Sequence, residues 1–250
     1  MSVVTFNIWR SNETEGTFRE YKTEITEGMV VLDAVLQIQQ EQANDLAVRW
    51  NCKAGKCGSC SAEINGHPRL MCMTRMSDMP ADKPVSIQPM KAFPVIRDLV
   101  TDVSVNFRIK RKIKKFKPRT PDAPDGTWRM DQIDIDRVQE FRKCIECFLC
   151  QDVCHVLREH QLHEKFVGPR HLVYLAALEM HPLDVEDRRS ELKVQDGIGF
   201  CNITKCCTTV CPEHITITDN AIIPLKERVA DKFYDPLMKL FRIFRKKKLT

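Results

Sequence analysis

Cysteine thiolates are the side chains in this sequence whose spacing could do chemistry. The twelve cysteines fall into three groups: Cys52, Cys57, Cys60 and Cys72; Cys144, Cys147, Cys150 and Cys154; and Cys201, Cys206, Cys207 and Cys211. The sequence begins Met-Ser-Val-Val, with no basic stretch or cleavage site typical of an export signal. Structural disulfides are rare in reducing compartments, so we expect these thiols to bind metal.

The first group has the spacing C-x4-C-x2-C followed by a distant cysteine, which is typical of plant-type [2Fe–2S] sites. Two irons require four thiolates. Gly55 and Gly58 would let the loop backbone approach and donate N–H groups to the cluster sulfurs. A structural zinc site is the alternative, but zinc ribbons usually carry two C-x2-C pairs and this group has one.

The second group, Cys144 to Cys154, has the bacterial ferredoxin spacing C-x2-C-x2-C-x3-C, apart from His155, where proline usually follows. The third group fits the same template if Thr204 occupies the second cysteine position. Cys201, Cys207 and Cys211 then occupy the remaining positions, and Pro212 follows. We expect the leftover Cys206 to be a packed, inert thiol.

In paired runs of this kind, the fourth cysteine of each run binds the cluster of the other run. The predicted ligands of a [4Fe–4S] cluster are therefore Cys144, Cys147, Cys150 and Cys211. Three thiolates remain for the other cluster, namely Cys154, Cys201 and Cys207. Because a neutral threonine hydroxyl is a poor iron ligand beside a thiolate, we expect a [3Fe–4S] cluster there. Two zinc sites are the competing interpretation.

The N-terminal segments around these cysteines indicate a sheet with one helix. Alternating apolar residues predict a hairpin over residues 4–8 and 21–26, and apolar residues at three- and four-residue intervals predict a helix over 31–38. Asn65-Gly66 predicts a second hairpin, and residues 85–87 a last strand.

The C-terminal segments indicate helices, over residues 135–141, 168–182 and 221–232. Between the two parts, residues 106–119 hold eight basic residues and no acidic one, and prolines follow. Like charge and proline oppose compact packing, so we expect a connector. The predicted domains are residues 1–105, a linker over 106–127, and 128–250.

Composition limits the remaining function classes. At 250 residues with 43% hydrophobic content, the chain can bury a core, and its formal charge of +5 does not by itself indicate nucleic acid. No apolar run reaches the length of a membrane span. Apolar residues at helical spacing among basic ones, from Phe233 to Phe244, predict a terminal amphipathic helix suited to an anionic membrane surface or an anchor subunit.

The sequence Arg49-Trp-Asn-Cys52-Lys-Ala-Gly-Lys-Cys57-Gly-Ser-Cys60, the two crossed runs, and Thr204 in place of a cysteine resemble the iron–sulfur subunits of succinate dehydrogenase and fumarate reductase. The similarity extends over nearly the whole chain and includes Pro94-Val-Ile-Arg-Asp-Leu-Val. It implies an α+β fold, with a β-grasp plant-type ferredoxin domain followed by an all-α domain like bacterial ferredoxins.

The resemblance also implies a role and partners. Electrons would pass from FAD in a separate flavoprotein subunit through [2Fe–2S], [4Fe–4S] and [3Fe–4S] clusters to quinone at a membrane-anchor subunit, or in reverse during fumarate reduction. The succinate site would lie on the flavoprotein, so we expect no catalytic residue and no nucleic-acid partner here. In a bacterium, the subunit would lie peripherally at the cytoplasmic face of the plasma membrane.

The chain departs from better-known family members after Cys154, where proline and then tryptophan commonly lie near the quinone. His155 adjoins a cluster ligand, and we regard it as a candidate quinone-proximal residue. His160 and His163 could donate protons or bind a metal, but we expect both to be exposed. Two alternatives remain, an iron–sulfur subunit of another flavin-linked dehydrogenase and a zinc-stabilised nucleic-acid-binding module.

Overall fold

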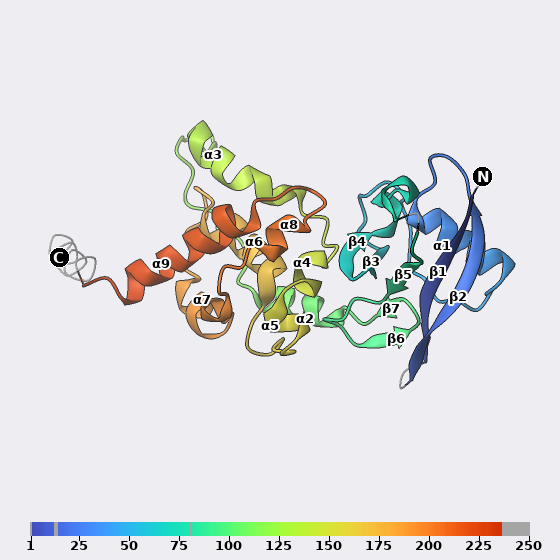
Figure 1. The fold of residues 1–250 in the computed structure, drawn as a ribbon. Coiled ribbons are helices and arrows are strands. Elements are labelled where there is room, and N and C mark those ends of the chain that lie inside the picture. The colour runs from blue at the N-terminus through green and yellow to red at the C-terminus, as the bar shows by residue number, and fades with distance from the viewer. Residues whose placement is uncertain (1, 13–14, 81, 237–250) are drawn as a thin grey trace.

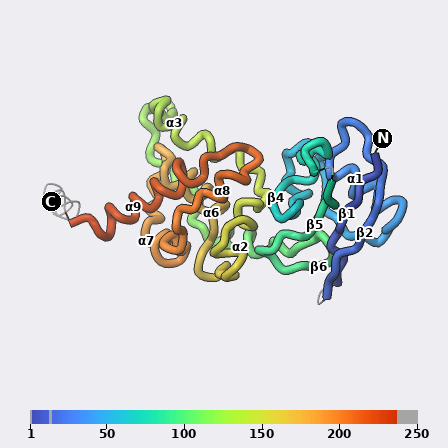
Figure 2. The backbone as a smooth tube through the Cα atoms, in the orientation of Figure 1, coloured from blue at the N-terminus to red at the C-terminus, as the bar shows by residue number. Residues whose placement is uncertain are grey.

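The computed structural model describes residues 2–12, 15–80 and 82–236 and consists of two parts that lie side by side. A strand-rich N-terminal part contacts a helical C-terminal part, and helix α9 leads away from the body at the end opposite the sheet (Figure 1). The same path is followed by the backbone tube in Figure 2. A mixed sheet followed by helices makes this an α+β protein.

Five strands form the sheet of the N-terminal part, in the order β2-β1-β5-β3-β4. The central strand β5 is parallel to its neighbour β1, and every other pairing in this sheet is antiparallel. The strands are β1 Ser2–Ser11, β2 Gly16–Ile25, β3 Ser61–Ile64, β4 His67–Leu70 and β5 Val85–Gln88, and a separate small pair consists of β6 Val95–Arg97 and β7 Val100–Thr101. Both predicted hairpins and the predicted last strand are confirmed.

Helix α1, Val31–Glu41, packs its apolar side into the core of this part. Leu32, Val35 and Ile38 recur at helical spacing and are buried. At its start, the Asp33 carboxylate accepts a hydrogen bond from the Val30 backbone N–H at 3.1 Å. The helix predicted over residues 31–38 is therefore confirmed, and it ends shortly before the loop that carries the first cysteine group.

The helical part is built around α6, most of whose residues are buried. Its helices are α2 Ser104–Lys112, α3 Gln132–Gln139, α4 Leu149–Asp152, α5 His155–Arg158, α6 Gly168–Glu179, α7 Arg189–Val194, α8 Cys206–Thr209 and α9 Ile223–Phe233. Short 3₁₀ turns are η1 Met71–Met73, η2 Met76–Asp78, η3 Glu140–Lys143 and η4 Ile198–Phe200, and a π-helical turn η5 spans Ile217–Ile222. The three predicted helices are present.

Residues 106–112, the first half of the basic segment 106–119, lie in helix α2. One face of α2 is anchored by Asn106, whose side-chain oxygen accepts a hydrogen bond from Gln151 at 3.0 Å. The Asn106 backbone oxygen lies 3.0 Å from His171 Nε2. One turn further along the helix, Lys110 pairs with Glu146. Hydrogen bonds and ion pairs to other elements thus let a strongly basic segment pack.

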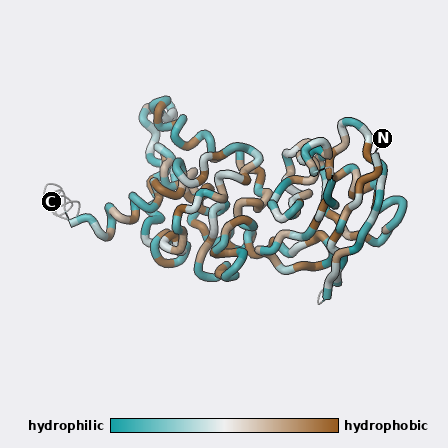
Figure 3. Tube along the Cα trace, viewed as in Figure 1, coloured by the Kyte–Doolittle hydropathy of each residue, from teal (hydrophilic) through white to brown (hydrophobic). Residues whose placement is uncertain are grey.

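The two parts share a continuous core. Their buried apolar residues form one cluster, and Figure 3 shows hydrophobic segments on both sides of the junction. The junction also holds a buried ion pair between Glu63 and Arg158, and the Asp152 carboxylate accepts a hydrogen bond from the Ala92 N–H at 3.0 Å. A fixed junction matters because the first and second cysteine groups meet there. The terminal helix expected beyond Phe233 lies mostly outside the described residues.

Candidate iron–sulfur cluster sites

Three cysteines of the first group lie on a loop, residues 52–60, whose backbone turns repeatedly through the left-handed region, and Cys72 lies in the turn η1. Gly55 and Gly58 have φ values of +66° and +68°, which glycine adopts without strain. Backbone N–H groups of Ala54 and Lys56 both donate to Cys52 Sγ at 3.3 Å. A loop that directs N–H donors at sulfur fits a cluster whose thiolates and sulfides carry negative charge.

The thiols of this group differ in their surroundings. Cys60 and Cys72 are buried, whereas Cys52 and Cys57 are half-buried. Burial raises the pKa of Cys60 to about 12. Burial also opposes ionisation of Cys57, but hydrogen bonds with Ser59 and Cys52 outweigh it and hold the pKa of Cys57 at about 6. Iron binding must therefore release a proton from Cys60, which couples cluster assembly to pH.

The first loop touches the second cysteine group directly. A Cβ atom added at Gly58 would lie 2.6 Å from Cys147 Cα, so only glycine permits this approach. The Ser61 hydroxyl donates to the Cys147 carbonyl oxygen at 2.9 Å. The two cysteine groups are therefore in contact across the junction of the two parts.

A small cavity lies next to this contact, and the fourth cysteine of the third group lines it together with three of the second. Its lining cysteines are Cys144, Cys147, Cys150 and Cys211. Burial raises the pKa of Cys147 to about 12 and holds that of Cys150 well above its usual range. The fold thus brings together four thiols from two distant runs in an apolar environment.

Arg170 also lines this cavity, and sequence reasoning missed it. Its side chain is buried, with Nη2 2.5 Å from Glu146 Oε1. Its Nε is buried with no hydrogen-bond partner among the described residues. Buried N–H donors nearly always have a partner, so this one fits a cavity that receives a group with sulfur acceptors. Arg170 lies opposite the predicted apolar side of the 168–182 helix, which includes Leu172 and Ala176, so helical spacing gave no signal for it.

A second small cavity is lined by the three cysteines left over by the first. They are Cys154, Cys201 and Cys207, and the same wall includes Thr204, Cys206 and His155. The sulfur of Cys207 lies 3.5 Å from Thr218 Oγ1, and the Thr208 hydroxyl donates to that same oxygen at 3.0 Å. Thr218 can therefore direct its own proton to the sulfur.

The two ferredoxin-like runs share one backbone conformation. In the second group, Glu146 and Phe148 have φ values of +57° and +61°, and they flank Cys147. In the third group, Ile203 and Lys205 have φ values of +62° and +63°, and they flank Thr204. Thr204 therefore occupies the backbone position that Cys147 occupies in the second group.

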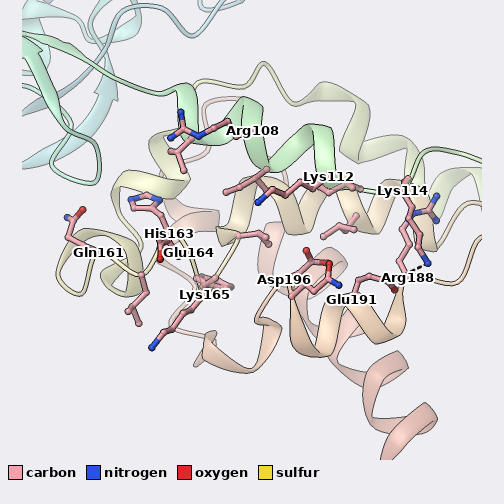
Figure 4. A pocket seen from close by; sticks show the side chains of 18 of the residues that line it. Arg108, Lys112, Lys114, Gln161, His163, Glu164, Lys165, Arg188, Glu191 and Asp196 are labelled. Carbon is pink, nitrogen blue, oxygen red and sulfur yellow. Dashed lines mark hydrogen bonds and ion pairs between the residues drawn. The ribbon is translucent and has the colours of Figure 1, made fainter.

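The histidines after Cys154 lie in different places. His155 lines the second cavity, and His160 is exposed as expected. The expectation that His163 is exposed was wrong, because its Nε2 lies 2.6 Å from the Ala92 carbonyl oxygen and its ring lies against Phe93. His163 lines a separate, cysteine-free cavity between α2, the 161–167 segment and α7 (Figure 4).

Within the part of the chain that the structure describes, no three His, Cys, Asp or Glu side chains are arranged to hold a single metal ion. Each thiolate of a cubane-type cluster binds its own iron, so cluster ligands surround a cavity instead of converging on one point. The cysteines here line cavities in that manner.

Comparison with known proteins places these sites in a family. Residues 5–108 match the model of a 2Fe-2S iron-sulfur cluster binding domain, and residues 140–215 that of a 4Fe-4S dicluster domain. The chain is 34% identical over 208 residues to the fumarate reductase iron-sulfur subunit of Mycobacterium tuberculosis, covering 81% of this chain and 82% of that protein. The chain belongs to the family of succinate dehydrogenase and fumarate reductase iron–sulfur subunits.

Other members of the family agree in sequence and in fold. The succinate dehydrogenase iron-sulfur subunit of Bacillus subtilis is 28% identical over 233 residues, covering 86% of this chain and 88% of that protein. A chain in the structure of the Mycobacterium smegmatis Sdh1 complex in the apo form superposes with a TM-score of 0.90 and 58% identity. That match covers 94% of this chain and 98% of the other, so the family fold extends across both parts.

Proposed function

We propose that this chain is the electron-transfer subunit of a membrane-bound succinate:quinone oxidoreductase. It would carry electrons between a flavoprotein, which holds FAD and the succinate or fumarate site, and quinone at a membrane-anchor subunit. One observation carries the proposal, namely that the three cysteine sites form an unbroken row. The first loop contacts Cys147, and a single run supplies Cys150 to the first cavity and Cys154 to the second.

The proposed ligands follow this row. Cys52, Cys57, Cys60 and Cys72 would hold a [2Fe–2S] cluster; Cys144, Cys147, Cys150 and Cys211 a [4Fe–4S] cluster; and Cys154, Cys201 and Cys207 a [3Fe–4S] cluster. Iron–sulfur clusters accept and release single electrons. The lining of the two cavities supports the exchange of fourth cysteines between the runs.

The protein's own residues would set the environment of that row. Backbone N–H groups at Cys52, the Arg170 guanidinium and the Thr218 hydroxyl each place a donor at a site. Donors that face cluster sulfurs favour the reduced state and so raise the reduction potential. Burial of Cys60 and Cys150 keeps water from these sites.

The finer points of the fold and placement are also proposals. The parallel pairing of β1 with the central strand β5 and the packing of α1 support a β-grasp ferredoxin domain over residues 1–105, followed by the linker 106–127 and a helical domain over 128–250. None of the helices within residues 2–12, 15–80 and 82–236 combines the length and apolarity that crossing a bilayer requires. In a bacterium, we place the subunit peripherally at the cytoplasmic face of the plasma membrane, held by an anchor subunit, with His155 near the quinone.

The test uses the intact complex, co-expressed with its flavoprotein and anchor subunits. Succinate added without oxygen should abolish the paramagnetic signal of an oxidised [3Fe–4S] centre and generate that of a reduced [2Fe–2S] centre, and quinone should reverse both changes. Clusters that respond to dithionite but not to succinate would contradict the proposal. Reduction by glycolate or glycerol phosphate instead would favour another flavin-linked dehydrogenase, and zinc in place of iron would favour the nucleic-acid-binding alternative.

A further inference from the structure

Cys206 is the cysteine that the proposed ligand sets leave unused, and it lines the same cavity as Cys154, Cys201 and Cys207. Its sulfur lies 2.7 Å from Thr204 Oγ1. Thr204 stands in the backbone position of the missing cysteine ligand, so a thiol lies directly beside the corner where the fourth iron of a cubane would be held.

The corresponding residue of the other run shows that this placement is particular to the third group. Position 149 is the counterpart of 206, since each follows a left-handed residue and begins a short helix. Leu149 is 1% exposed and belongs to the core, whereas Cys206 is half-buried and contacts the Thr204 hydroxyl. The third group thus carries a metal-binding side chain where the second carries a packing residue.

We propose that Cys206 is a reserve ligand, which converts the three-iron centre into a four-iron centre when ferrous iron is available. The inference rests on the proposed function, because it requires a three-iron cluster in this cavity. A thiolate is a far better iron ligand than the Thr204 hydroxyl, and the two side chains are already in contact. A rotation of the Cys206 side chain would bring its sulfur to the position where the fourth iron would be held.

The conversion balances in atoms and charge. A reduced [3Fe–4S] core of charge zero takes up one Fe²⁺ to give a [4Fe–4S] core of charge 2+, so no further electron is needed. One bond forms between the incoming iron and Cys206 Sγ, and the S–H proton leaves to solvent. The electron that reduces the three-iron core comes from the flavoprotein along the row of clusters. Because cluster type sets the potential, iron supply would alter electron flow at the last site.

The experiment uses the purified complex without oxygen. Dithionite and excess ferrous iron are added, unbound iron is removed, and a mild oxidant such as thionine is supplied before low-temperature paramagnetic resonance and iron analysis. The wild type should lose roughly nine-tenths of its [3Fe–4S] signal and gain about one iron per chain. Cys206→Ala should keep both its signal and its iron content.

Two further variants complete the test. Thr204→Ala removes the hydroxyl that contacts Cys206 but leaves the thiol, and it should convert as the wild type does. Cys206→Leu copies the residue found at position 149 and should resist conversion, which keeps the test open if Cys206→Ala does not assemble.

The outcomes separate this inference from the proposed function. A wild-type signal that ferrous iron leaves unchanged, or an equal loss of signal in Cys206→Ala, would overturn the reserve-ligand role while leaving the three-iron site intact. A wild type without a three-iron signal, together with a Cys206→Ala variant that shows one, would make Cys206 a permanent ligand. That result would overturn the reserve-ligand role, because the fourth iron position would already be occupied.

Discussion

The two cysteine-lined cavities have closely similar backbones and different side chains. Both runs place left-handed residues on either side of the second ligand position, which is Cys147 in one and Thr204 in the other. Both then enter a short helix that delivers the third cysteine. The backbone therefore sets where ligands can lie, while the residue at one position decides how many thiolates the cavity offers.

The cavities also differ in their surroundings. The four-cysteine cavity lies at the junction, where it meets Gly58 and contains the buried Arg170. The three-cysteine cavity is bordered by exposed residues, including Thr204 and Lys205. In an electron-transfer row, the first arrangement suits an internal relay and the second suits the end at which electrons leave.

The largest expected effect comes from substituting serine for the fourth cysteine of either run. Cys211→Ser should remove the [4Fe–4S] cluster and leave the three-iron signal, because Cys211 lines the four-cysteine cavity. Cys154→Ser should do the reverse, since Cys154 lines the other cavity. Iron analysis and paramagnetic resonance on the isolated complexes measure both changes.

Each of these two variants is the control for the other. If Cys211→Ser instead abolished the three-iron signal and spared the four-iron centre, each run would supply all its own ligands and the crossed assignment would be wrong. If a variant chain does not accumulate, Cys→Ala at the same position, followed by cluster reconstitution of the purified chain, provides the same comparison.

A smaller effect, in which a cluster is converted but retained, is expected from Thr204→Cys. This change gives the second cavity the ligand that Cys147 supplies to the first, so a four-iron cluster should form without added iron. The three-iron signal should fall from about one spin per chain to roughly a tenth of that in the oxidised sample. Thr204→Ser is the matched control, because it keeps a hydroxyl at this position and should keep the signal.

The sequence predicted the strands of the five-stranded sheet and helices α1, α3, α6 and α9, since these depend on local spacing, but it did not predict β6, β7, α2 or α7. The hairpins, helix α1 and helix α6 follow from apolar periodicity and from Asn65-Gly66. The exchange of Cys154 and Cys211 between runs rests on a template, and the cavity linings support it. The spacing within a run is therefore enough to predict which positions of that run hold ligands.

Long-range contacts were not predictable in the same way. Burial of Asn106 within a strongly basic segment depends on Gln151 and His171, which are far away in sequence. The hydrogen bond of His163 depends on the Ala92 carbonyl oxygen, 71 positions away. Charge composition predicts average solvation, but the buried Asn106 and the packing of Val105 and Ile109 against the core hold this helix in place.

At the junction, a steric change should have a moderate effect. In Gly58→Ala the new Cβ would lie 2.6 Å from Cys147 Cα, and the backbone would have to keep a φ of +68°. The steric clash and the backbone strain would both destabilise the variant. We expect the variant to be destabilised by about 2–4 kcal/mol and its thermal midpoint to fall by roughly 5–10 °C. Differential scanning fluorimetry of the isolated chain measures this change.

Gly66→Ala separates the two causes, because Gly66 has a φ of +78° but nothing within 4 Å of its added Cβ. It should cost only about 1 kcal/mol, from backbone strain alone. Equal losses of stability in the two variants would mean that the contact between Gly58 and Cys147 does not hold the four-cysteine cavity against the first loop.

The smallest expected effect is electronic and is confined to the three-cysteine cavity. Thr208 donates to Thr218 Oγ1 at 3.0 Å, which leaves the Thr218 proton free for Cys207 Sγ at 3.5 Å. Thr218→Val removes this donor from an iron-bound thiolate, and the reduced state, which carries more negative charge, loses more. A net hydrogen bond of about 0.5–1.5 kcal/mol corresponds to a fall of roughly 20–60 mV in a one-electron potential.

Redox titration followed by paramagnetic resonance should show this fall at the three-iron centre, while the potential of the four-iron centre in the same sample should not change. Thr218→Ser, which retains the hydroxyl, should restore the potential. A shift shared by both clusters would mean that the substitution acts through packing of η5 and not through the sulfur.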